Sequence, residues 1–421
     1  MDILIIGSGG REHAIAWSLK NSKRTEKLYA IPGNAGIAEL AECHSEIGVM
    51  EFDKILAFVA AHPSIGLTVV APDDPLAEGL VDLLNKNGFR AFGPIKSAAR
   101  LEASKSFSKS FMKKYAIPTA SCEVFDDYGR AREYVLSSPH PLVVKADGLA
   151  VGKGVLICKT PTESLAALKE LMLDKRFGRS GDRVVIEEFL EGPEITVLSF
   201  TDGNTIVPMV SSQDHKRAFD GDKGLNTGGM GTFSPSRVYT AEIEREFREK
   251  IMNPTLDGLK AEGIVFRGVL YFGLMLTRDG LKVIEYNSRF GDPETQVILP
   301  RLKTDLLEIF NACTDGTLDK IDIEWEDCAC VCVILASGGY PAAFKKGLPI
   351  TVGALDRGIL LFHAGTAKKD GVLVTSGGRV LGVTAKGKDI GEAREKAYRN
   401  IEKITFEGMH YRTDIGIKIE S

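Results

Sequence analysis

The sequence predicts a multidomain protein of mixed α/β and α+β class, with a parallel α/β domain at the N-terminus and an α+β domain at the C-terminus. Three observations lead to this prediction. The chain has 421 residues, enough for about three domains. Short apolar strands alternate with helices over residues 1–100, which is typical of a parallel α/β layer. Longer strand runs over 183–325 favour an antiparallel sheet, and a further α+β unit begins near 328.

The first domain is predicted to begin with a buried strand at Asp2–Ile6, because this start is too short and too acidic for a signal peptide. The other elements expected in this domain are strands at Lys27–Ile31, Leu67–Ala71 and Phe89–Phe92, and helices at Arg11–Ser22, near Asp53–Ala61 and near Ala77–Asn87.

The rest of the chain is predicted to contain further helices and two groups of strands. The helix Lys105–Tyr115 precedes a connection that contains Pro118, and a second helix is expected at Thr162–Leu173. The middle strands are expected at Val184–Glu188, Glu194–Thr201, Thr205–Met209, Gly268–Thr277 and Leu281–Tyr286. The third unit should contain strands Ala329–Ala336, Val372–Thr375 and Arg379–Lys386 and the helix Ile390–Ile404.

Composition excludes several classes of function. The net charge is −4, which gives no electrostatic case for binding nucleic acid or a membrane surface. No apolar run approaches the ~20 residues of a membrane span. The seven cysteines are scattered and are interpreted as reduced thiols of a cytoplasmic protein. A metal site at Cys328, Cys330 and Cys332 is disfavoured, because their spacing is not that of zinc ligands and no histidine is near.

The most informative stretch, residues 142–155, indicates a phosphate clamp. An apolar strand ends at Lys145, a glycine-rich turn contains Gly152, Lys153 and Gly154, and another apolar run follows. Glycines let backbone N–H groups approach a phosphate, and lysines add compact positive charge. The stretch is not a Walker P-loop, because it lacks that motif and leads into a strand rather than a helix.

A second glycine-rich turn, residues 7–13, links the first strand to the first helix. Glu12 stands where a dinucleotide fingerprint needs glycine, so a nicotinamide cofactor is disfavoured. Two alternatives remain for this turn. It binds a phosphate monoester through the N–H groups of Gly9 and Gly10 and through Arg11, or it is only a tight connection between strand and helix.

Three other charged stretches each have a functional and a structural interpretation. Lys105 and Lys109 share a helix face, which is more typical of solvent exposure than of phosphate binding. The strand end near Glu187 and Glu188 is suited to bind an adenine edge and a ribose. An ordinary strand end whose acids are solvated explains the pattern equally well. The charged, glycine-rich run 213–231 is too polar for a core and favours a functional loop over a disordered one.

Residues 283–295 indicate a metal site. Glu285 and Asn287 are two apart on a predicted strand, so both side chains point to one face. A carboxylate and an amide oxygen are hard ligands suited to Mg²⁺ beside nucleotide phosphates. Arg289 could hold a carboxylate or phosphate on the same face. The alternative is an ordinary polar face of a sheet.

Taken together, these stretches resemble the ATP-grasp ligases, and most closely the phosphoribosylamine–glycine ligase family. The resemblance is nearly end to end. It rests on GSGGREH at 7–13, LVVKADGLAVGKG at 142–154, QDHKR at 213–217, NTGGMG at 226–231, RFGDPETQ at 289–296, and, in the third unit, ASGGYP at 336–341, HAGT at 363–366 and GMHYRTDIG at 408–416. The runs QDHKR and NTGGMG are specific, whereas the clamp lysines are shared across the superfamily.

The resemblance implies an architecture and a reaction. The expected domains are an N-terminal domain at 1–102, an ATP-grasp core at 103–326 and a C-terminal domain at 327–421. Within the core, the nucleotide-clamp lobe should cover about 120–190 and the central lobe about 191–326. The implied enzyme is a cytoplasmic, monomeric carbon–nitrogen ligase of purine biosynthesis that uses ATP with Mg²⁺ or Mn²⁺. It would join glycine to 5-phosphoribosylamine through glycyl phosphate, giving glycinamide ribonucleotide, ADP and phosphate.

The resemblance also implies roles for single residues. ATP would be bound by Lys105, Lys145, Gly152, Lys153, Gly154, Glu187, Glu188, Leu190 and Glu194, and the metal by Glu285 and Asn287. The substrates would be bound by Gly9, Gly10, Arg11, Asp214, Lys216, Asn226, Arg289 and Asp292. Lys145, Asp214, Arg289 and Asp292 would be catalytic.

The sequence departs from the family pattern at three places, and other functions compete with the one that the resemblance implies. The run Tyr271–Leu276 lacks the acid that many ATP-grasp enzymes place there, Asp73 and Asp74 stand where a glutamate is expected, and Leu225 replaces an expected proline. The competing functions are another ATP-grasp ligase or carboxylase acting on a ribonucleotide, a nicotinamide oxidoreductase and a non-catalytic nucleotide sensor.

Overall fold

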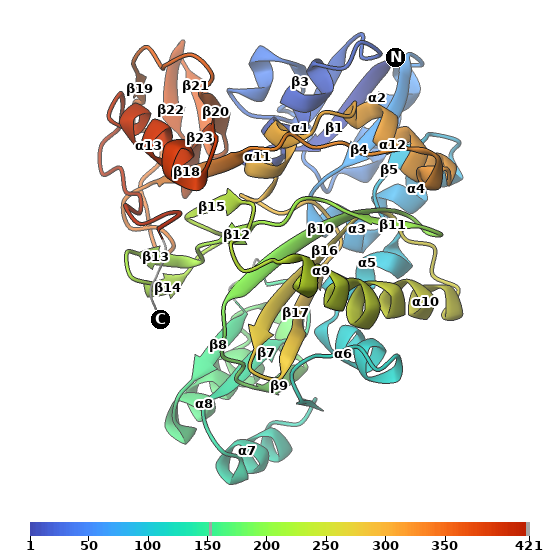
Figure 1. Ribbon diagram of the computed structural model, residues 1–421, viewed down its shortest axis with the longest axis vertical. Coiled ribbons are helices and arrows are strands. Elements are labelled where there is room, and N and C mark those ends of the chain that lie inside the picture. The colour runs from blue at the N-terminus through green and yellow to red at the C-terminus, as the bar shows by residue number, and fades with distance from the viewer. Residues whose placement is uncertain (151–153, 418–421) are drawn as a thin grey trace.

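The first hundred residues fold into a parallel sheet with the strand order β3-β2-β1-β4-β5 (Figure 1). The computed structural model describes residues 1–150 and 154–417. The strands are β1 (Asp2–Gly7), β2 (Leu28–Pro32), β3 (Glu42–Cys43), β4 (Ile65–Val70) and β5 (Ala91–Phe92). The strand order reverses between β1 and β4, so the carboxyl ends of these strands flank a crevice of the kind that binds ligands in open α/β sheets.

The first domain's helices differ from prediction at two places, since the helix at Lys96–Ala103 has no predicted counterpart and another predicted helix is divided. They are α1 (Gly10–Lys20), α2 (Phe52–Ala61), α3 (Asp73–Glu78), α4 (Leu80–Lys86) and α5 (Lys96–Ala103). The single helix predicted near Ala77–Asn87 is wrong, because Gly79 adopts a left-handed conformation with φ +91°. Such a glycine ends one helix, and α4 begins directly after it.

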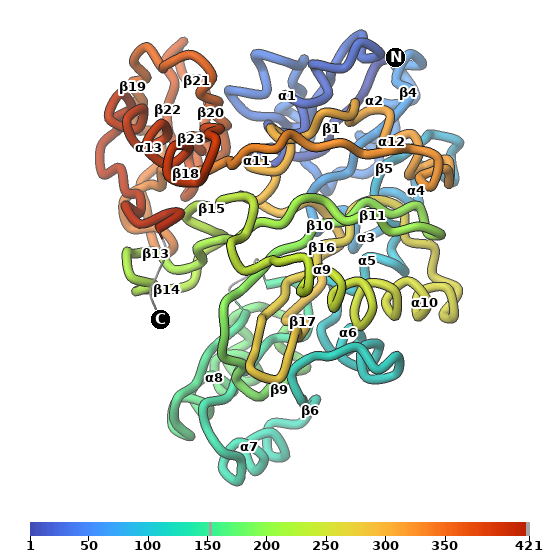
Figure 2. The backbone as a smooth tube through the Cα atoms, in the orientation of Figure 1, coloured from blue at the N-terminus to red at the C-terminus, as the bar shows by residue number. Residues whose placement is uncertain are grey.

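The clamp lobe is a small antiparallel sheet with its own hydrophobic core. Its strand order is β6-β9-β7-β8. The elements are β6 (Cys122–Phe125), α7 (Tyr128–Ser137), β7 (Leu142–Ala146), β8 (Val155–Cys158), α8 (Pro161–Leu168) and β9 (Val184–Glu188). The helix predicted through Leu173 changes after Leu168 into a π-helical turn, Lys169–Leu173. Figure 2 shows this lobe protruding at the opposite end of the molecule from the first and third units.

The central sheet is antiparallel, as predicted, with the strand order β11-β10-β16-β17. Its strands are β10 (Glu194–Asp202), β11 (Ile206–Pro208), β16 (Arg267–Thr277) and β17 (Gly280–Asn287). One face packs on α6 (Lys105–Lys114), α9 (Ala241–Phe247) and α10 (Asn253–Ala261). On the other face, Phe200 and Val269 share a core with the first sheet and α12 (Leu306–Asp315), which fixes the central sheet against the first domain.

The third unit is built on a sheet that takes strands from two distant parts of the chain. Its order is β12-β15-β18-β23-β20. Two strands, β12 (Gln213–Asp214) and β15 (Gly231–Ser234), come from the charged run, and the others are β18 (Ala329–Ala336), β20 (Leu360–His363) and β23 (Arg379–Gly387). The boundary expected at 326/327 therefore stays a prediction.

The remaining elements of the third unit complete it. They are α13 (Ile390–Ile401) and two strand pairs, β19 (Thr351–Val352) with β24 (Ile404–Thr405) and β21 (Thr366–Lys369) with β22 (Val372–Thr375). The helix predicted to reach Ile404 ends at Ile401, because Ile404 pairs as a strand. Among residues 1–150 and 154–417, no helix has the length and apolar content that a membrane crossing requires.

Two buried histidines join the first and third units. The ring Nδ1 of His13 accepts a hydrogen bond from the backbone N–H of His363 at 2.7 Å. Burial lowers the pKa of His13 to about 3, with a contribution from His363, and burial also lowers the pKa of His363 to about 4. Both rings are therefore neutral in the folded protein, whereas in the unfolded chain they take up protons below the ordinary pKa of about 6.5.

This difference predicts acid destabilisation. The histidines' contribution to stability is complete above about pH 6.5 and is lost as the pH falls from there toward 4 and then 3. Between pH 7.5 and pH 5, each histidine should lower the free energy of unfolding by about 2 kcal/mol. Urea unfolding at the two pH values should show the loss, and His13→Gln should reduce it. An equal loss in wild type and variant would contradict the assignment.

Candidate functional site

Several cations converge on Glu285 in β17. Burial alone would raise the pKa of this carboxyl, but the cations of Lys216, Lys145, Lys105 and Arg289 more than offset burial and lower it. These cations come from four separate segments, so only the folded chain brings them together. Four cations directed at one half-buried carboxylate are suited to hold a polyanion.

Lys145 is held in place by a buried carboxylate. Its Nζ lies 2.8 Å from Oε1 of Glu187, whose Oε2 lies 3.0 Å from Nζ of Lys109. All three side chains are less than a tenth exposed. Lys109 also donates to Thr119 Oγ1 at 2.8 Å. The interpretation of Lys109 as solvent-exposed is therefore wrong, and the side chain of Glu187 serves to position lysines.

The clamp turn is tied to the start of α6. The carboxylate of Asp147 accepts hydrogen bonds from the backbone N–H and the hydroxyl of Ser106, and Nζ of Lys105 donates to the Gly148 carbonyl at 3.0 Å. A carboxylate at a helix N-terminus is favoured by the helix dipole. Gly154 is buried beside Ala150, whereas Gly152 and Lys153 lie outside the described residues.

The predicted hinge links the clamp lobe to the central sheet. Glu188 accepts hydrogen bonds from the backbone N–H of Ser121 at 2.9 Å and from Nζ of Lys282 in β17 at 3.3 Å. Leu190 is half-buried. Glu194, the predicted ribose acid, is ion-paired with Lys216 at 2.8 Å, so these two predicted residues lie together.

Glu285 and Asn287 lie side by side at the end of β17, as their spacing predicts. The amide of Asn287 donates to Glu285 at 3.4 Å and accepts from Arg289 at 3.3 Å. Both contacts are long for hydrogen bonds, so an incoming ion could replace them readily. Among the described residues, no cluster of three or more His, Cys, Asp or Glu could hold a metal. The pair fits a Mg²⁺ ion that takes its other ligands from water and phosphate, because a carboxylate and an amide oxygen are hard ligands.

The guanidinium of Arg289 is paired with the carboxylate of Glu102, a residue that the sequence analysis did not identify. Its Nη2 lies 2.8 Å from Oε1 of Glu102, which is buried in α5. Burial raises the pKa of Glu102, and Arg289 opposes that shift. Glu102 also accepts a hydrogen bond from the Ser288 backbone N–H at 2.7 Å. It therefore fixes the Ser288 backbone and the Arg289 side chain, which follow directly after Asn287.

Asp214 and Glu294 form a second acidic region on the other side of Lys216. Burial, and then the charge of Glu294, raise the pKa of Asp214 well above its usual range. Glu294 is buried and accepts a hydrogen bond from the Tyr271 hydroxyl at 3.0 Å. A buried carboxyl with a raised pKa is suited to general acid–base chemistry.

The motifs QDHKR (213–217) and NTGGMG (226–231) are hydrogen-bonded to each other. Residues 217–226 form a hairpin of β13 (Arg217–Phe219) and β14 (Lys223–Asn226), in which Arg217 pairs with Asn226. Beside it, Thr227 donates through its N–H and its hydroxyl to the Lys216 carbonyl, each at 2.8 Å. The hairpin thus places Lys216 and Asn226 at one end, next to Asp214.

A segment of the third unit holds this hairpin. Arg412 is fully buried, and its guanidinium contacts the carboxylates of Asp222 at 2.7 Å and Asp414 at 2.6 Å. The ring Nε2 of His410 contacts the Ala218 carbonyl at 2.7 Å. The motif GMHYRTDIG therefore acts as a support for the hairpin rather than as a ligand site.

Arg412→Ala is expected to lower the free energy of unfolding by about 2–4 kcal/mol, because it leaves two carboxylates without their cation and creates a cavity. Denaturant unfolding measures this effect. Arg399→Ala is the control, because the Arg399–Asp356 pair is exposed and should contribute at most about 1 kcal/mol. Equal effects of the two variants would contradict this role.

The glycine-rich turn after β1 is already occupied by a side chain. The Glu12 carboxylate accepts hydrogen bonds from the Gly9 backbone N–H and from Nε of Arg11, each at 2.6 Å. Arg11 also donates to the Phe290 carbonyl. Gly10 packs against the Gln296 side chain. The groups predicted to bind a phosphate monoester here thus have an anionic partner within the protein.

Asp292 forms an ion pair with Arg379 of the third unit, a residue that the sequence analysis did not identify. Nη2 of Arg379 lies 3.3 Å from Asp292 Oδ2, and its Nη1 donates to the carbonyls of Asp292 and Gly228, each at 2.6 Å. Arg379 therefore joins NTGGMG to the run RFGDPETQ. Its distance in sequence from both left no pattern that could reveal it.

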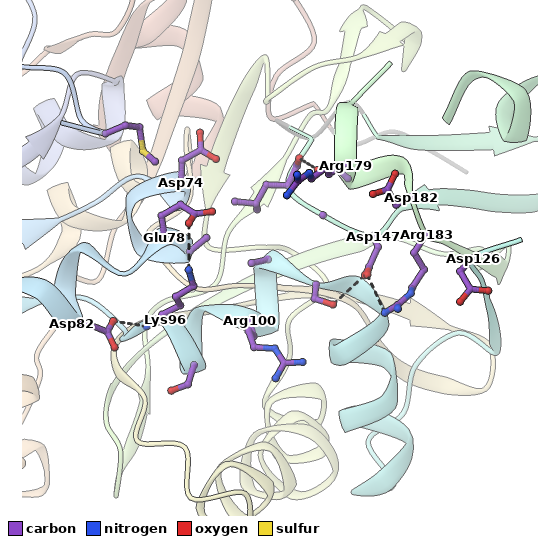
Figure 3. Close-up of a pocket in the computed structure, with 18 residues that line it drawn as sticks. Asp74, Glu78, Asp82, Lys96, Arg100, Asp126, Asp147, Arg179, Asp182 and Arg183 are labelled. Carbon is purple, nitrogen blue, oxygen red and sulfur yellow. Dashed lines mark hydrogen bonds and ion pairs between the residues drawn. The ribbon is translucent and has the colours of Figure 1, made fainter. Parts of the chain in front are cut away.

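Two cavities flank the site. The larger, of about 1020 Å³, lies between the first domain and the clamp lobe (Figure 3). In Figure 3, Asp74, Glu78 and Lys96 reach it from one side and Arg179 and Arg183 from the other. Its charges are mixed in sign, so they favour no single ligand charge. The smaller cavity, of about 380 Å³, is lined by residues that include Gly9, Asp292 and Arg379.

The two-lobed core, with Lys145 of the clamp sheet and Lys105 of α6 near the Glu285 and Asn287 pair on an antiparallel sheet, defines an ATP-grasp enzyme. Residues 103–295 match the family model of the phosphoribosylglycinamide synthetase ATP-grasp (A) domain. The N-domain model of the same synthetase matches residues 1–102, and its C-domain model matches 330–418. The chain belongs to the phosphoribosylglycinamide synthetase family.

Individual proteins agree with this assignment. A phosphoribosylamine–glycine ligase of Caldanaerobacter subterraneus subsp. tengcongensis is 49% identical over 99% of each chain. A crystal structure of a phosphoribosylamine–glycine ligase from Thermotoga maritima superposes with a TM-score of 0.85 at 38% identity, covering 99% of this chain and 100% of that one. A biotin carboxylase structure from Campylobacter jejuni shares the fold alone, with a TM-score of 0.75 at 14% identity over 97% and 92% of the chains.

Proposed function

We propose that this protein is a carbon–nitrogen ligase of purine biosynthesis that joins glycine to 5-phosphoribosylamine. ATP is converted to ADP and phosphate, and glycinamide ribonucleotide is formed. The observation that carries the proposal is the convergence of Lys105, Lys145, Lys216 and Arg289 on Glu285, with Lys216 held next to Asp214 and Asn226 by the hairpin of β13 and β14. The names of the closely similar relatives support the choice of substrates.

ATP binds between the clamp lobe and the central sheet in this proposal. Lys105 and Lys145 contact its phosphates, and the glycine-rich turn with Gly152, Lys153 and Gly154 covers them. The backbone from Glu187 to Leu190 faces the adenine, and Glu194 faces the ribose. The pairing of Lys145 with Glu187 supports this role, because it orients the ammonium before ATP arrives.

Glu285 and Asn287 would hold Mg²⁺ or Mn²⁺. The ion would neutralise part of the phosphate charge when bound. The protein's own cations, Lys105, Lys145 and Arg289, stabilise the negative charge that develops during phosphoryl transfer.

The chemistry proceeds in two steps. A carboxylate oxygen of glycine attacks the γ-phosphorus, the bond to ADP breaks, and glycyl phosphate forms. The amine of 5-phosphoribosylamine then attacks the glycyl carbonyl carbon, and inorganic phosphate leaves. Asp214 accepts the proton that the amine loses, for which its raised pKa suits it. Arg289 holds the glycine carboxylate, and Asn226, Lys216 and Asp292 position the amine substrate.

We further propose that the enzyme works in the cytoplasm as a monomer, with domains at 1–102, 103–326 and 327–421. The cysteines support the location, because all seven are free thiols, as a reducing compartment favours.

ADP release tests the function. Purified protein should release ADP only when ATP, Mg²⁺, glycine and freshly made phosphoribosylamine are all present. Release that requires bicarbonate instead of glycine would keep the ATP-grasp chemistry and overturn the substrate. Binding of ATP without any turnover would favour a nucleotide sensor.

A further inference from the structure

The smaller cavity lies where three domains meet. Its walls come from the turn after β1, from Asp292 after β17 and from third-unit loops around Tyr340, residues 364–366 and residues 376–377. Its volume of about 380 Å³ is in the range of small-ligand pockets. Asn34 fixes two of these walls together, because its amide donates to the carbonyls of Ser8 and His363, each at 2.8 Å.

A substrate phosphate could bind the Gly9 N–H and Arg11 only by displacing the Glu12 carboxylate, which occupies both donors. This carboxylate is buried, and both of its oxygens have short hydrogen bonds to Gly9 and Arg11. A dianionic phosphate placed there would stand against this carboxylate and be repelled. A phosphate-bearing substrate must therefore be held by other groups near this turn.

The adjoining cavity offers such groups. A fifth of the Arg379 side chain is exposed, and the arginine lines the cavity. Ser376 and Ser8 also line it, and neither hydroxyl has a hydrogen-bond partner in the part of the chain that the structure describes. Guanidinium and hydroxyl groups are common donors to phosphate oxygens.

The cavity also leads toward the proposed reaction centre. Gly228, whose carbonyl accepts from Arg379, is followed by Gly229, which packs between Pro293 and Asp214. A Cβ at Gly229 would lie 2.7 Å from Asp214 Oδ1 and 2.4 Å from Pro293 Cδ. The backbone of Gly228 and Gly229 thus connects Arg379 in the cavity wall to Asp214, the carboxyl that accepts the amine proton.

Resting on the proposed function, we propose that this three-domain cavity binds the phosphoribosyl group of the amine substrate. Arg379, Ser376 and Ser8 face the phosphate, and Asp292 accepts hydrogen bonds from the ribose hydroxyls. Arg379 has a second effect, since its contacts with Asp292 and Gly228 position both neighbours. The third unit therefore contributes directly to substrate binding. In the turn after β1, Glu12 occupies the Gly9 N–H and Arg11, and Ser8 faces the phosphate.

Two variants test the proposal. Ser376→Asp places a negative charge in the cavity and removes no hydrogen bond that the Ser376 side chain makes within the described chain. It should raise KM for phosphoribosylamine about tenfold or more, through repulsion of the phosphate. Arg379→Gln removes the cation and should raise the same KM about 10–100-fold. KM for ATP and for glycine should change less than twofold in Ser376→Asp. Ser97→Asp, the same change in the larger cavity, is the control and should have no effect.

Ribose 5-phosphate supplies an independent readout. It should inhibit the wild-type enzyme competitively against phosphoribosylamine, ribose should not, and Ser376→Asp should weaken the inhibition. An unchanged KM for phosphoribosylamine in both variants, with the same inhibition as wild type, would overturn the proposal. Absence of glycine-dependent turnover in the wild type would instead overturn the proposed function. Thermal unfolding of each variant separates loss of binding from loss of folding.

Discussion

Lys145→Ala is expected to lower kcat/KM for ATP about 10²-fold or more. The ammonium of Lys145 is buried, oriented by Glu187 and directed toward the region of Glu285. Its loss removes a preorganised positive charge from the place where the phosphates are proposed to bind, and one such stabiliser contributes about 10²–10³-fold to rate. Steady-state kinetics at varied ATP concentration measure the effect.

The fold should survive this substitution, because Glu187 keeps its second partner, Lys109, at 3.0 Å. Lys169→Ala is a matched control, since Lys169 belongs to the same lobe but forms an exposed pair with Asp174. The control should retain wild-type kinetics. A Lys145→Ala enzyme with wild-type kcat/KM for ATP would show that the nucleotide does not bind at the clamp.

Glu285→Gln is expected to lower kcat about 10²–10³-fold and to raise the Mg²⁺ concentration needed for half-maximal rate. The amide lacks the charge that balances Lys105, Lys145, Lys216 and Arg289, and it is a poorer ligand for a hard cation. Mn²⁺ titrations in the presence of ADP, followed by electron paramagnetic resonance, measure metal affinity independently of turnover.

Glu246→Gln provides the comparison. Glu246 contacts the opposite end of the same strand through the Leu281 backbone N–H, so it reports on general disturbance of β17. It should bind Mn²⁺ as the wild type does. Equal Mn²⁺ affinity in Glu285→Gln and wild type would remove Glu285 from the metal site.

The sequence predicted those features that depend on neighbours along the chain. The spacing of Glu285 and Asn287 placed both on one strand face, where the structure has them. The glycine-rich run after Lys145 was predicted to join two strands, and β7 and β8 pair as an antiparallel hairpin. In each case the strand period of two decides the outcome locally.

Features that depend on contacts between distant segments could not be predicted. Glu102 is 187 residues from Arg289, Arg379 is 87 residues from Asp292, and Arg412 is 190 residues from Asp222. Each is an ordinary charged residue in its own segment, with no local pattern that marks it. Burial decides their roles, because a buried charge is retained only when a partner reaches it.

Lys109 shows why local reasoning can mislead. Two lysines on one helix face predict solvent exposure when the helix is considered alone. In the fold, this face lies against β9, whose Glu187 pairs with Lys109. The opposite happened at the turn after β1, where a pattern suited to an external anion is satisfied by the protein's own Glu12.

The fold does not decide between a ligase and a carboxylase, because biotin carboxylases share it. The choice rests on the site, where the QDHKR and NTGGMG segments bring Asp214, Lys216 and Asn226 together and Lys216 lies near Glu285. Those residues suit an amine acceptor that must lose a proton, which supports the ligase.

The measurement that tests the central claim most directly follows the oxygen atoms of glycine. Glycine labelled with ¹⁸O in its carboxylate is turned over with ATP, Mg²⁺ and phosphoribosylamine, and the inorganic phosphate is analysed by mass spectrometry. Activation as glycyl phosphate predicts that each phosphate released carries one ¹⁸O atom, because the carboxylate oxygen that attacks ATP leaves with the phosphorus. Phosphate free of ¹⁸O, formed together with ADP, would contradict the account.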